Sequence, residues 1–429
     1  MPAGTRRATL PRVGLLDRIL PPMSPDRFGR KLVKRLEAEH PDTLFEFDAE
    51  PFRVVTSSDC NGVINLHNIY AMYAQAGLGQ RRESFERAVR MAGAFADREN
   101  MAKLAFPAVK ERILPRVWSR MTFDLSTLAA EPMTGSDGKR FEPLTRPVGE
   151  TGELVYGFVV DSEESVMLIG KSHAAELGKT FDELWPIARD NLYRQSVGRF
   201  FELGPGVWMS PFGDTHDATR MLLPDLFADL NLKGRPVVAV PRPEVLLVCG
   251  EDDARTVGLL VGAAREKAAE PGRTLVNGVF VLDADVWRPL RLPRDHPASA
   301  EVELNHKIDL ARAAAEVSNT LLANAERSGK RMFIGELRLV VRDSDGWPFL
   351  LANWPEEFGV VFLPPCDLIL FGDSGRGVKP EGLAGDPRFA IAEQTIGGVT
   401  FLRADGRDRA ELAGLPTVDL TEMEARRAV

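Results

Sequence analysis

The sequence contains very few cysteines. Three occur in 429 residues, Cys60, Cys249 and Cys366, and they stand far apart, without a C-x-x-C pair. This spacing argues against a disulfide framework and against a cysteine-based zinc site, and it is typical of a chain in a reducing compartment. We therefore expect a cytoplasmic protein.

Long hydrophobic runs are also missing. A membrane-spanning helix needs about 20 apolar residues, and the most apolar segments here are soon interrupted by Pro241, Pro243 or arginine. The first residues lack the apolar core and the small-residue cleavage site of a secretory signal. The sequence predicts no membrane contact, and we expect residues 1–24 to form a loose tail, with a true start codon near Val13 as one interpretation.

Positive charge is in deficit. The formal net charge is −8, with 54 Lys and Arg against 62 Asp and Glu. A chain with this balance is a poor match for the phosphate backbone, so no nucleic-acid partner is expected. The segment GQRRESFERAVR (79–90) is mixed in sign and is interpreted as one solvated face of a helix.

The elements that are present indicate an α+β fold. Ser24-Pro25-Asp26 is a helix start, Thr180 and Glu183 have the spacing of a capping box, and 301–329 is the clearest amphipathic helix. Several pairs of short apolar runs around polar turns predict antiparallel hairpins flanked by helices. Two domains are expected, 25–290 and 301–429, with a long loop near 128–152 in the first.

Two distant segments are nearly alike and suggest an internal repeat. VVAVPRPEVLLVCGEDD begins at Val237, and VVFLPPCDLILFGDSG begins at Val360. Each is interpreted as a hairpin, and each is followed by a similar strand, NGVFVLDAD at 277–285 and GGVTFLRAD at 397–405. The alternative is that any buried pair of strands around a proline turn looks alike.

Part of the chain resembles a bacterial family. The segment LLPDLFADLNLKGRPVVAVPRPEVLLV (222–248) looks like the central signature of the YtpQ family of uncharacterised proteins. DATRMLL (217–223), ILPRVWSR (113–120) and LGKTFDELWPIARDNL (177–192) fit in the same order, although Glu244 stands where aspartate is expected. The resemblance covers about residues 25–290 and implies an α+β fold in bacterial cytoplasm, with no established activity or cofactor.

The densest group of reactive side chains is GDTHDATR (213–220). Asp214, His216 and Asp217 offer two carboxylates and an imidazole within four residues, and Arg220 follows. These groups are candidates for a ligand site or a divalent-metal site. The structural alternative is that Asp217 caps a short helix while Asp214 stabilises the preceding turn.

A second candidate is an aromatic surface patch in WPFLLANWPEEFG (347–359). Trp347, Phe349 and Trp354 beside an acidic turn are the residues we expect to contact a partner if they are exposed. The alternative is that these rings belong to the core, which is the usual place of large aromatic side chains.

The favoured function is a non-enzymatic module that binds a partner, expected to be another protein, through a sheet face or a hairpin edge. Its basis is that no G-x-S-x-G elbow occurs in the chain and that no Gly-Lys-[Ser/Thr] follows the glycine-rich segment GDSGRG (372–377). The alternative is a metal-dependent hydrolase or transferase centred on Asp214, His216, Asp217 and Arg220. The sequence identifies neither a cofactor nor an oligomeric state.

Overall fold

The computed structural model describes most of the chain, and its contacts divide the chain into two units. The smaller unit comprises 1–113, 134–142 and 159–184, and the larger comprises 114–133, 143–158 and 185–429. The described residues are 21–50, 52–56, 62–96, 105–128, 141–161, 166–270, 272–354, 360–371, 376–384, 389–406, 417–419 and 425–427. Cys60 and residues 129–140 of the expected loop at 128–152 lie outside them.

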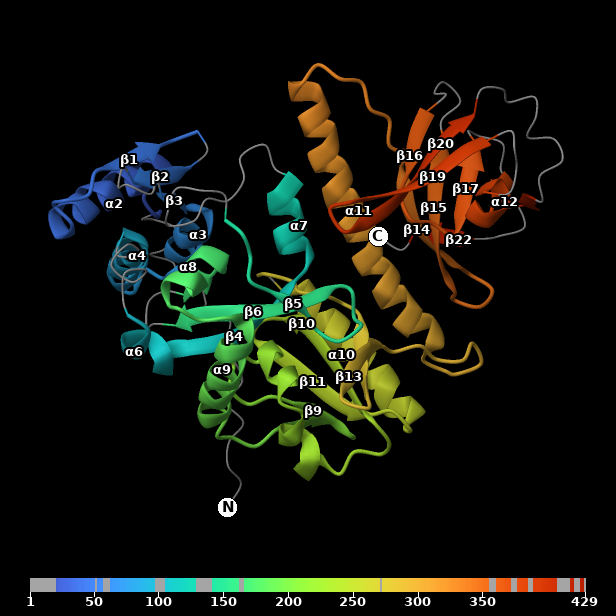
Figure 1. Cartoon of the computed structure of the whole chain (residues 1–429), viewed down its shortest axis with the longest axis horizontal. Coiled ribbons are helices and arrows are strands. Elements are labelled where there is room, and N and C mark those ends of the chain that lie inside the picture. The colour runs from blue at the N-terminus through green and yellow to red at the C-terminus, as the bar shows by residue number, and fades with distance from the viewer. Residues whose placement is uncertain are drawn as a thin grey trace. The chain divides into compact units, whose positions relative to one another are not determined.

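The smaller unit packs helices on a small antiparallel sheet (Figure 1). Strands β1, β2 and β3 pair in that order. Its elements are α2 (Pro25–Glu39), β1 (Phe45–Asp48), β2 (Arg53–Thr56), β3 (Gly62–Asn65), α3 (His67–Gln75), α4 (Arg81–Ala96), α6 (Phe106–Val109), η1 (Lys110–Arg112), β7 (Val166–Ile169) and α8 (Lys171–Glu176).

The predicted helix starts in this unit are confirmed. The Ser24 side chain accepts a hydrogen bond from the Arg27 backbone N–H at the start of α2. Thr180 and Glu183 form the capping box, because each side chain accepts a hydrogen bond from the other residue's N–H.

The buried core of α2, β2, β3 and α4 is aromatic and aliphatic, and it includes Phe28, Leu32, Leu36, Val54, Ile64, Phe85 and Val89.

The larger unit is built on a six-stranded antiparallel sheet with the order β13-β12-β10-β11-β9-β8. Strands β10 and β11 form the predicted hairpin, joined by Pro243 and Glu244. These strands are β8 (Phe201–Gly204), β9 (Val207–Met209), β10 (Pro236–Arg242), β11 (Val245–Gly250), β12 (Val279–Asp283) and β13 (Val286–Pro289).

Alternate residues of this sheet enter two separate cores. Val237 and Ala239 of β10 pack with α10 (Ala254–Ala269), whereas Val238 and Val240 pack on the opposite face. There they contact residues of η2 (Ala218–Leu222) and η3 (Pro224–Leu230), such as Phe227. Both faces of the sheet are therefore covered at its centre, as a strand buried on both sides requires.

The remaining helices and strands include two more sheets in the C-terminal third. One has the order β21-β18-β17-β15-β14-β22, and the other β16-β20-β19. The elements are β4 (Ile113–Ser119), α7 (Met121–Leu128), β5 (Arg146–Pro147), β6 (Leu154–Asp161), α9 (Phe181–Gln195), α11 (Ser299–Arg327), β14 (Leu337–Arg342), β15 (Pro348–Trp354), β16 (Val360–Leu363), β17 (Leu368–Phe371), β18 (Arg376–Val378), α12 (Pro380–Ala384), β19 (Phe389–Ile396), β20 (Val399–Gly406), β21 (Thr417–Asp419) and β22 (Ala425–Arg427).

The second expected hairpin is not a hairpin. β16 pairs with β20, and β17 pairs in parallel with β15, so the two runs of VVFLPPCDLILF belong to different sheets. The connection contains Pro364 and Pro365, which cannot donate backbone hydrogen bonds and favour extended geometry in the preceding residue. The two similar segments do share one feature. In each, the first strand pairs with a strand further along the chain, β10 with β12 and β16 with β20.

The α+β class is therefore confirmed, with several antiparallel sheets, and strands β15 and β17 pair in parallel. Across the described residues, no helix is both long enough and apolar enough to cross a membrane.

Candidate functional site

The segment that carries the candidate residues is fixed in the larger unit by hydrogen bonds to three other elements. The backbone N–H of Ala218 donates to the Pro243 carbonyl at 2.9 Å, in the turn between β10 and β11. The Thr219 hydroxyl accepts from the Val117 backbone N–H of β4 at 3.1 Å. The Trp287 indole of β13 donates to the Met221 carbonyl at 3.1 Å. The second half of the segment, from His216 to Arg220, is thus buried in the core, whereas Gly213 and Thr215 are exposed.

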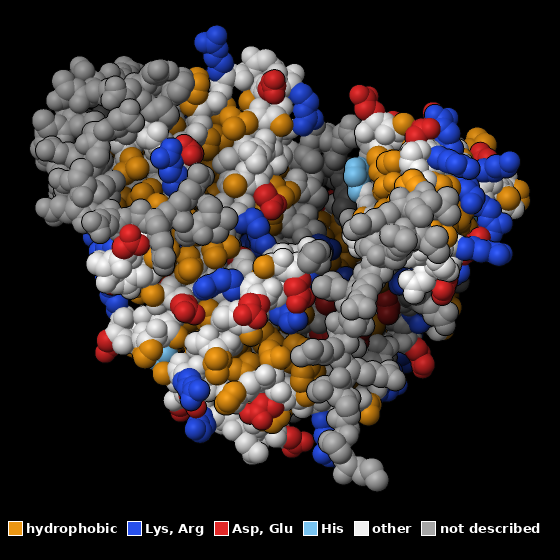
Figure 2. All heavy atoms as spheres, turned by 180° about the vertical axis from the view of Figure 1, so that it is seen from behind, with side chains coloured by type: hydrophobic (Ala, Val, Ile, Leu, Met, Phe, Trp, Pro, Cys, Tyr) orange, Lys and Arg blue, Asp and Glu red, His pale blue; other side chains and the backbone are white. Residues whose placement is uncertain are grey.

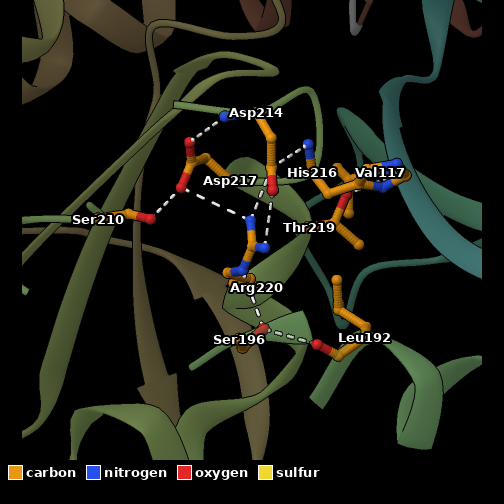
Figure 3. A network of polar contacts seen from close by, with 9 residues as sticks. All are labelled: Val117, Leu192, Ser196, Ser210, Asp214, His216, Asp217, Thr219 and Arg220. Carbon is orange, nitrogen blue, oxygen red and sulfur yellow. Dashed lines mark hydrogen bonds and ion pairs between the residues drawn. The ribbon is translucent and has the colours of Figure 1, made fainter. Parts of the chain in front are cut away.

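Arg220 lies at the centre of a buried polar network (Figure 3). Its guanidinium donates to both carboxylate oxygens of Asp214, at 2.7 and 2.8 Å, and through Nε to the Ser196 hydroxyl at 2.9 Å. The guanidinium carbon also lies 3.8 Å from the centre of the Phe212 ring. Arg220 itself is 0% exposed, so these contacts replace water completely around the charge.

Asp217 completes the network from the other side. One of its oxygens lies 3.6 Å from Arg220 Nη1 and also accepts a hydrogen bond from the Ser210 hydroxyl, and the other accepts from the Asp214 backbone N–H at 3.0 Å. The expected helix cap is wrong, because the Asp217 side chain makes no capping bond to η2. The expected role of Asp214 in the turn is confirmed, since its carboxylate accepts from the His216 N–H at 2.8 Å.

The two carboxyl groups have opposite pKa shifts. Burial acts to raise the pKa of Asp214, but hydrogen bonds and charge from Arg220 outweigh it and hold that pKa below its usual range. Burial raises the pKa of Asp217, and the negative charge of Asp214 adds to this effect. Arg220 therefore hydrogen-bonds mainly to Asp214. The Asp217 carboxylate accepts its hydrogen bonds from the Ser210 hydroxyl and from a backbone N–H.

The imidazole of His216 does not join the carboxylates. Figure 3 shows its ring turned away from Arg220 and towards β4. Burial, together with the charge of Arg116, lowers the pKa of His216 to about 4. The side chain is therefore neutral at physiological pH.

This arrangement binds the reactive groups to one another. Both oxygens of Asp214 are held by Arg220, and the Ser210 hydroxyl, itself buried, donates to Asp217. Among the residues that the structure describes, no three His, Cys, Asp or Glu side chains are grouped so that they could hold a metal ion. The contacts indicate a role in holding chain segments together.

Neither described cysteine has the features of an activated thiol. Burial raises the pKa of both Cys249 and Cys366 to about 12, and for each a nearby aspartate adds to the effect. A thiol with such a pKa is protonated at neutral pH and is a poor nucleophile.

The aromatic residues of 347–354 separate into two environments. Trp354 is 4% exposed and packs in the core with Ala352, so its expected place in a surface patch is wrong. Trp347 and Phe349 are half-buried under arginines, with Arg294 stacked on Trp347 and Arg342 on Phe349. The acidic turn after Trp354 lies outside the described residues.

The surface feature that the sequence did not reveal lies at 193–203. Ten large hydrophobic residues are exposed in the described part of the chain, and four of them fall in this short stretch. They are Tyr193 (51%), Val197 (87%), Phe201 (43%) and Leu203 (44%). Only the FELGPGVWM pattern, two apolar runs around a Pro-Gly turn, signals the hairpin of β8 and β9 in the sequence.

The Arg220 network supports the segment that leads into β8. Ser196 accepts from Arg220 and donates to the Leu192 carbonyl at 2.7 Å, which joins the end of α9 to the network. Gly198 passes the Phe212 ring so closely that an added Cβ would lie 3.0 Å from it. The exposed residues Val197, Phe201 and Leu203 therefore follow a buried, hydrogen-bonded residue, Ser196.

We expect Ser196→Ala to destabilise the larger unit by about 1–2 kcal/mol, because Arg220 Nε would lose its acceptor in a buried site. Ser196→Thr, which keeps the hydroxyl, is the matched control. Urea unfolding of both variants measures the difference, and equal stability of Ser196→Ala and wild type would show that this hydrogen bond contributes nothing.

The comparisons with known proteins give no relative for this chain: no family model, no curated protein and no solved structure matches it.

Proposed function

We propose that this protein is a non-enzymatic interaction module that binds an extended segment of another protein along strand β8. The observation that supports the proposal most directly is the exposure of Phe201 and Leu203 on an edge strand. Phe201 pairs with Met209 of β9, whose side chain packs against the α10 core. Phe201 and Leu203 are two residues apart and share a face of the sheet. They extend the apolar face that α10 covers, but they are themselves exposed.

The two edges of the six-stranded sheet differ in how they are covered. At β13, the Glu150 backbone N–H donates to the Trp287 carbonyl at 2.8 Å, and Gly149 lies against the same residue. At β8, β9 is the only pairing strand within the described part of the chain. An uncovered edge offers backbone N–H and C=O groups to a further strand, and strand addition is a common mode of peptide recognition.

The chemistry of β8 indicates the occupant. Phe201 and Leu203 favour apolar side chains at alternate positions of the bound segment, and the exposed Glu202 between them favours Lys or Arg on the other face. The ladder of β8 and β9 shifts register between Glu202 and Gly204. Because a bulge interrupts regular pairing, the bound segment should be short.

A peptide library displayed on phage and selected on the whole protein tests this proposal. Enriched peptides should alternate apolar and polar residues and should bind Phe201→Asp/Leu203→Asp at least about tenfold more weakly, a loss of about 1.4 kcal/mol or more. Leu310→Asp, which changes another exposed leucine of α11, should leave binding unchanged. Peptides that bind the double variant as well as wild type would refute binding at β8.

The metal-dependent hydrolase or transferase remains the alternative hypothesis, and no contact in the network favours it. Its test is titration calorimetry with Mn²⁺ on wild type and on Asp217→Asn. Saturable heat that disappears in the variant, with stability unchanged, would support it. The resemblance to the YtpQ family stays a hypothesis based on the motifs, whose central segment forms η3, β10 and β11.

A further inference from the structure

Basic side chains recur along two helices of the smaller unit. On α2, Arg27, Lys31 and Arg35 are four residues apart, and on α4, Arg82, Glu86 and Arg90 have the same spacing. Residues four apart lie on one side of a helix, one turn above another. Each row is therefore about 12 Å long and keeps to one side of its helix.

The two rows lie side by side. Lys31 Nζ is 4.5 Å from the centre of the Phe85 ring, and Arg35 Nη2 is 3.0 Å from a carboxylate oxygen of Glu86. Both contacts join α2 to α4 across adjacent surfaces. Five basic residues and one glutamate thus form a single surface, here named the basic helix face: Arg27, Lys31, Arg35, Arg82, Glu86 and Arg90.

The charge of this face is opposite to that of the whole chain. α2 and α4 together carry nine Lys and Arg and five Asp and Glu. Three of those acids, Asp26, Glu39 and Glu86, form ion pairs with Arg30 or Arg35. Figure 2 shows that acidic and basic side chains are interspersed on the face it presents. The net charge of α2 and α4 is therefore positive, although the net charge of the whole chain is negative.

The side chains of the basic helix face fit a phosphate backbone better than a protein surface. None of the ten exposed large hydrophobic residues in the described part of the chain lies on α2 or α4. A stable protein interface usually has an apolar or aromatic centre, whereas binding to phosphates needs only Lys and Arg. We infer that the basic helix face binds the phosphate backbone of nucleic acid, independently of β8.

Fluorescence anisotropy of the whole protein with labelled 20-base-pair duplexes of DNA and of RNA tests this inference. We expect a dissociation constant of about 10⁻⁴ to 10⁻⁶ M near physiological salt, and tighter binding at lower salt. The triple variant Arg27→Gln/Lys31→Gln/Arg82→Gln should bind at least about tenfold more weakly, and each lost contact should reduce the slope against salt by about one.

A second triple variant distinguishes binding by the basic helix face from a general effect of net charge. Arg255→Gln/Arg327→Gln/Lys330→Gln removes the same charge from exposed positions of the larger unit and should leave binding nearly unchanged. Equal loss in both triple variants would overturn the inference. So would no binding of either duplex at about 100 µM protein, which lies at the weak limit of non-specific binding. Binding of a glutamate-rich peptide in place of both duplexes would assign the face to an acidic polypeptide instead.

Discussion

Replacing Arg220 by methionine is expected to lower the free energy of unfolding of the larger unit by about 3–5 kcal/mol. Arg220 is completely buried and holds Asp214 with two hydrogen bonds. Its loss leaves the carboxylate of Asp217, also buried, without a nearby positive charge from this residue. An unpaired buried charge costs far more than the pair itself contributes, which is why a single substitution should have a large effect.

Amide hydrogen exchange in β10 and β11 is the appropriate measurement, because it reports on the sheet next to the network even if the two units unfold separately. Arg288→Met is the control, since Arg288 is about half exposed and forms surface ion pairs with Asp283 and Glu150. Such pairs contribute about 0–1 kcal/mol. If Arg220→Met and Arg288→Met were equally stable, the network would not hold the fold together.

Acid should destabilise the larger unit well above the pH at which surface carboxylates titrate. Burial lowers the pKa of His216 and of His306 to about 4, against 6.5 for an unperturbed histidine. The pKa of each histidine is lower in the folded than in the unfolded protein. Each neutral imidazole therefore contributes its full stabilisation of the folded state above pH 6.5, and this contribution is lost as pH falls towards 4. At pH 5 we expect roughly 2 kcal/mol of loss for each histidine, measured by urea unfolding at pH 7.5 and 5.

Variants isolate the two histidines from other titrating groups. Burial raises the pKa of Glu153 to about 7, and a raised pKa acts in the opposite sense, since its stabilisation is lost as pH rises through 7. His216→Leu and His306→Leu should each reduce the acid sensitivity by roughly the contribution of one histidine, whereas His67→Gln, at an exposed position, should not. Unchanged acid sensitivity in both Leu variants would show that the buried imidazoles do not cause it.

Local sequence was enough to predict elements whose signals lie within a few residues. Ser24, Thr180 and Glu183 start their helices through hydrogen bonds to residues three positions away. The β10–β11 hairpin also follows from a short turn between two apolar runs. In these cases the partner of each group is close in the chain, so its position is nearly fixed by spacing.

Features set by distant partners could not be predicted in this way. The runs at 360–363 and 368–371 match those of β10 and β11, but their pairing depends on β20 and β15. Asp217 precedes a helical turn as a cap would, yet the Ser210 hydroxyl and the Asp214 N–H bind its carboxylate. Sequence placed Asp214, Asp217 and Arg220 in one candidate site, but it did not show that Arg220 binds both carboxylate oxygens of Asp214.

Exposure was the least predictable property. Trp354 and Phe201 are both large aromatic residues in strands, but Trp354 is 4% exposed and Phe201 43%. The difference arises because β15 lies inside its sheet, between β17 and β14, whereas β8 lies at an edge. Strand order is a property of the whole fold, so composition around each residue does not reveal it.

Hydrogen exchange of the protein with a selected peptide bound is the decisive test of whether β8 accepts a further strand. We expect slower exchange of amides within Phe201–Gly204 in the complex, with exchange in β13 at the opposite edge unchanged. Peptide binding that leaves β8 exchange unchanged, or that protects another surface instead, would contradict it.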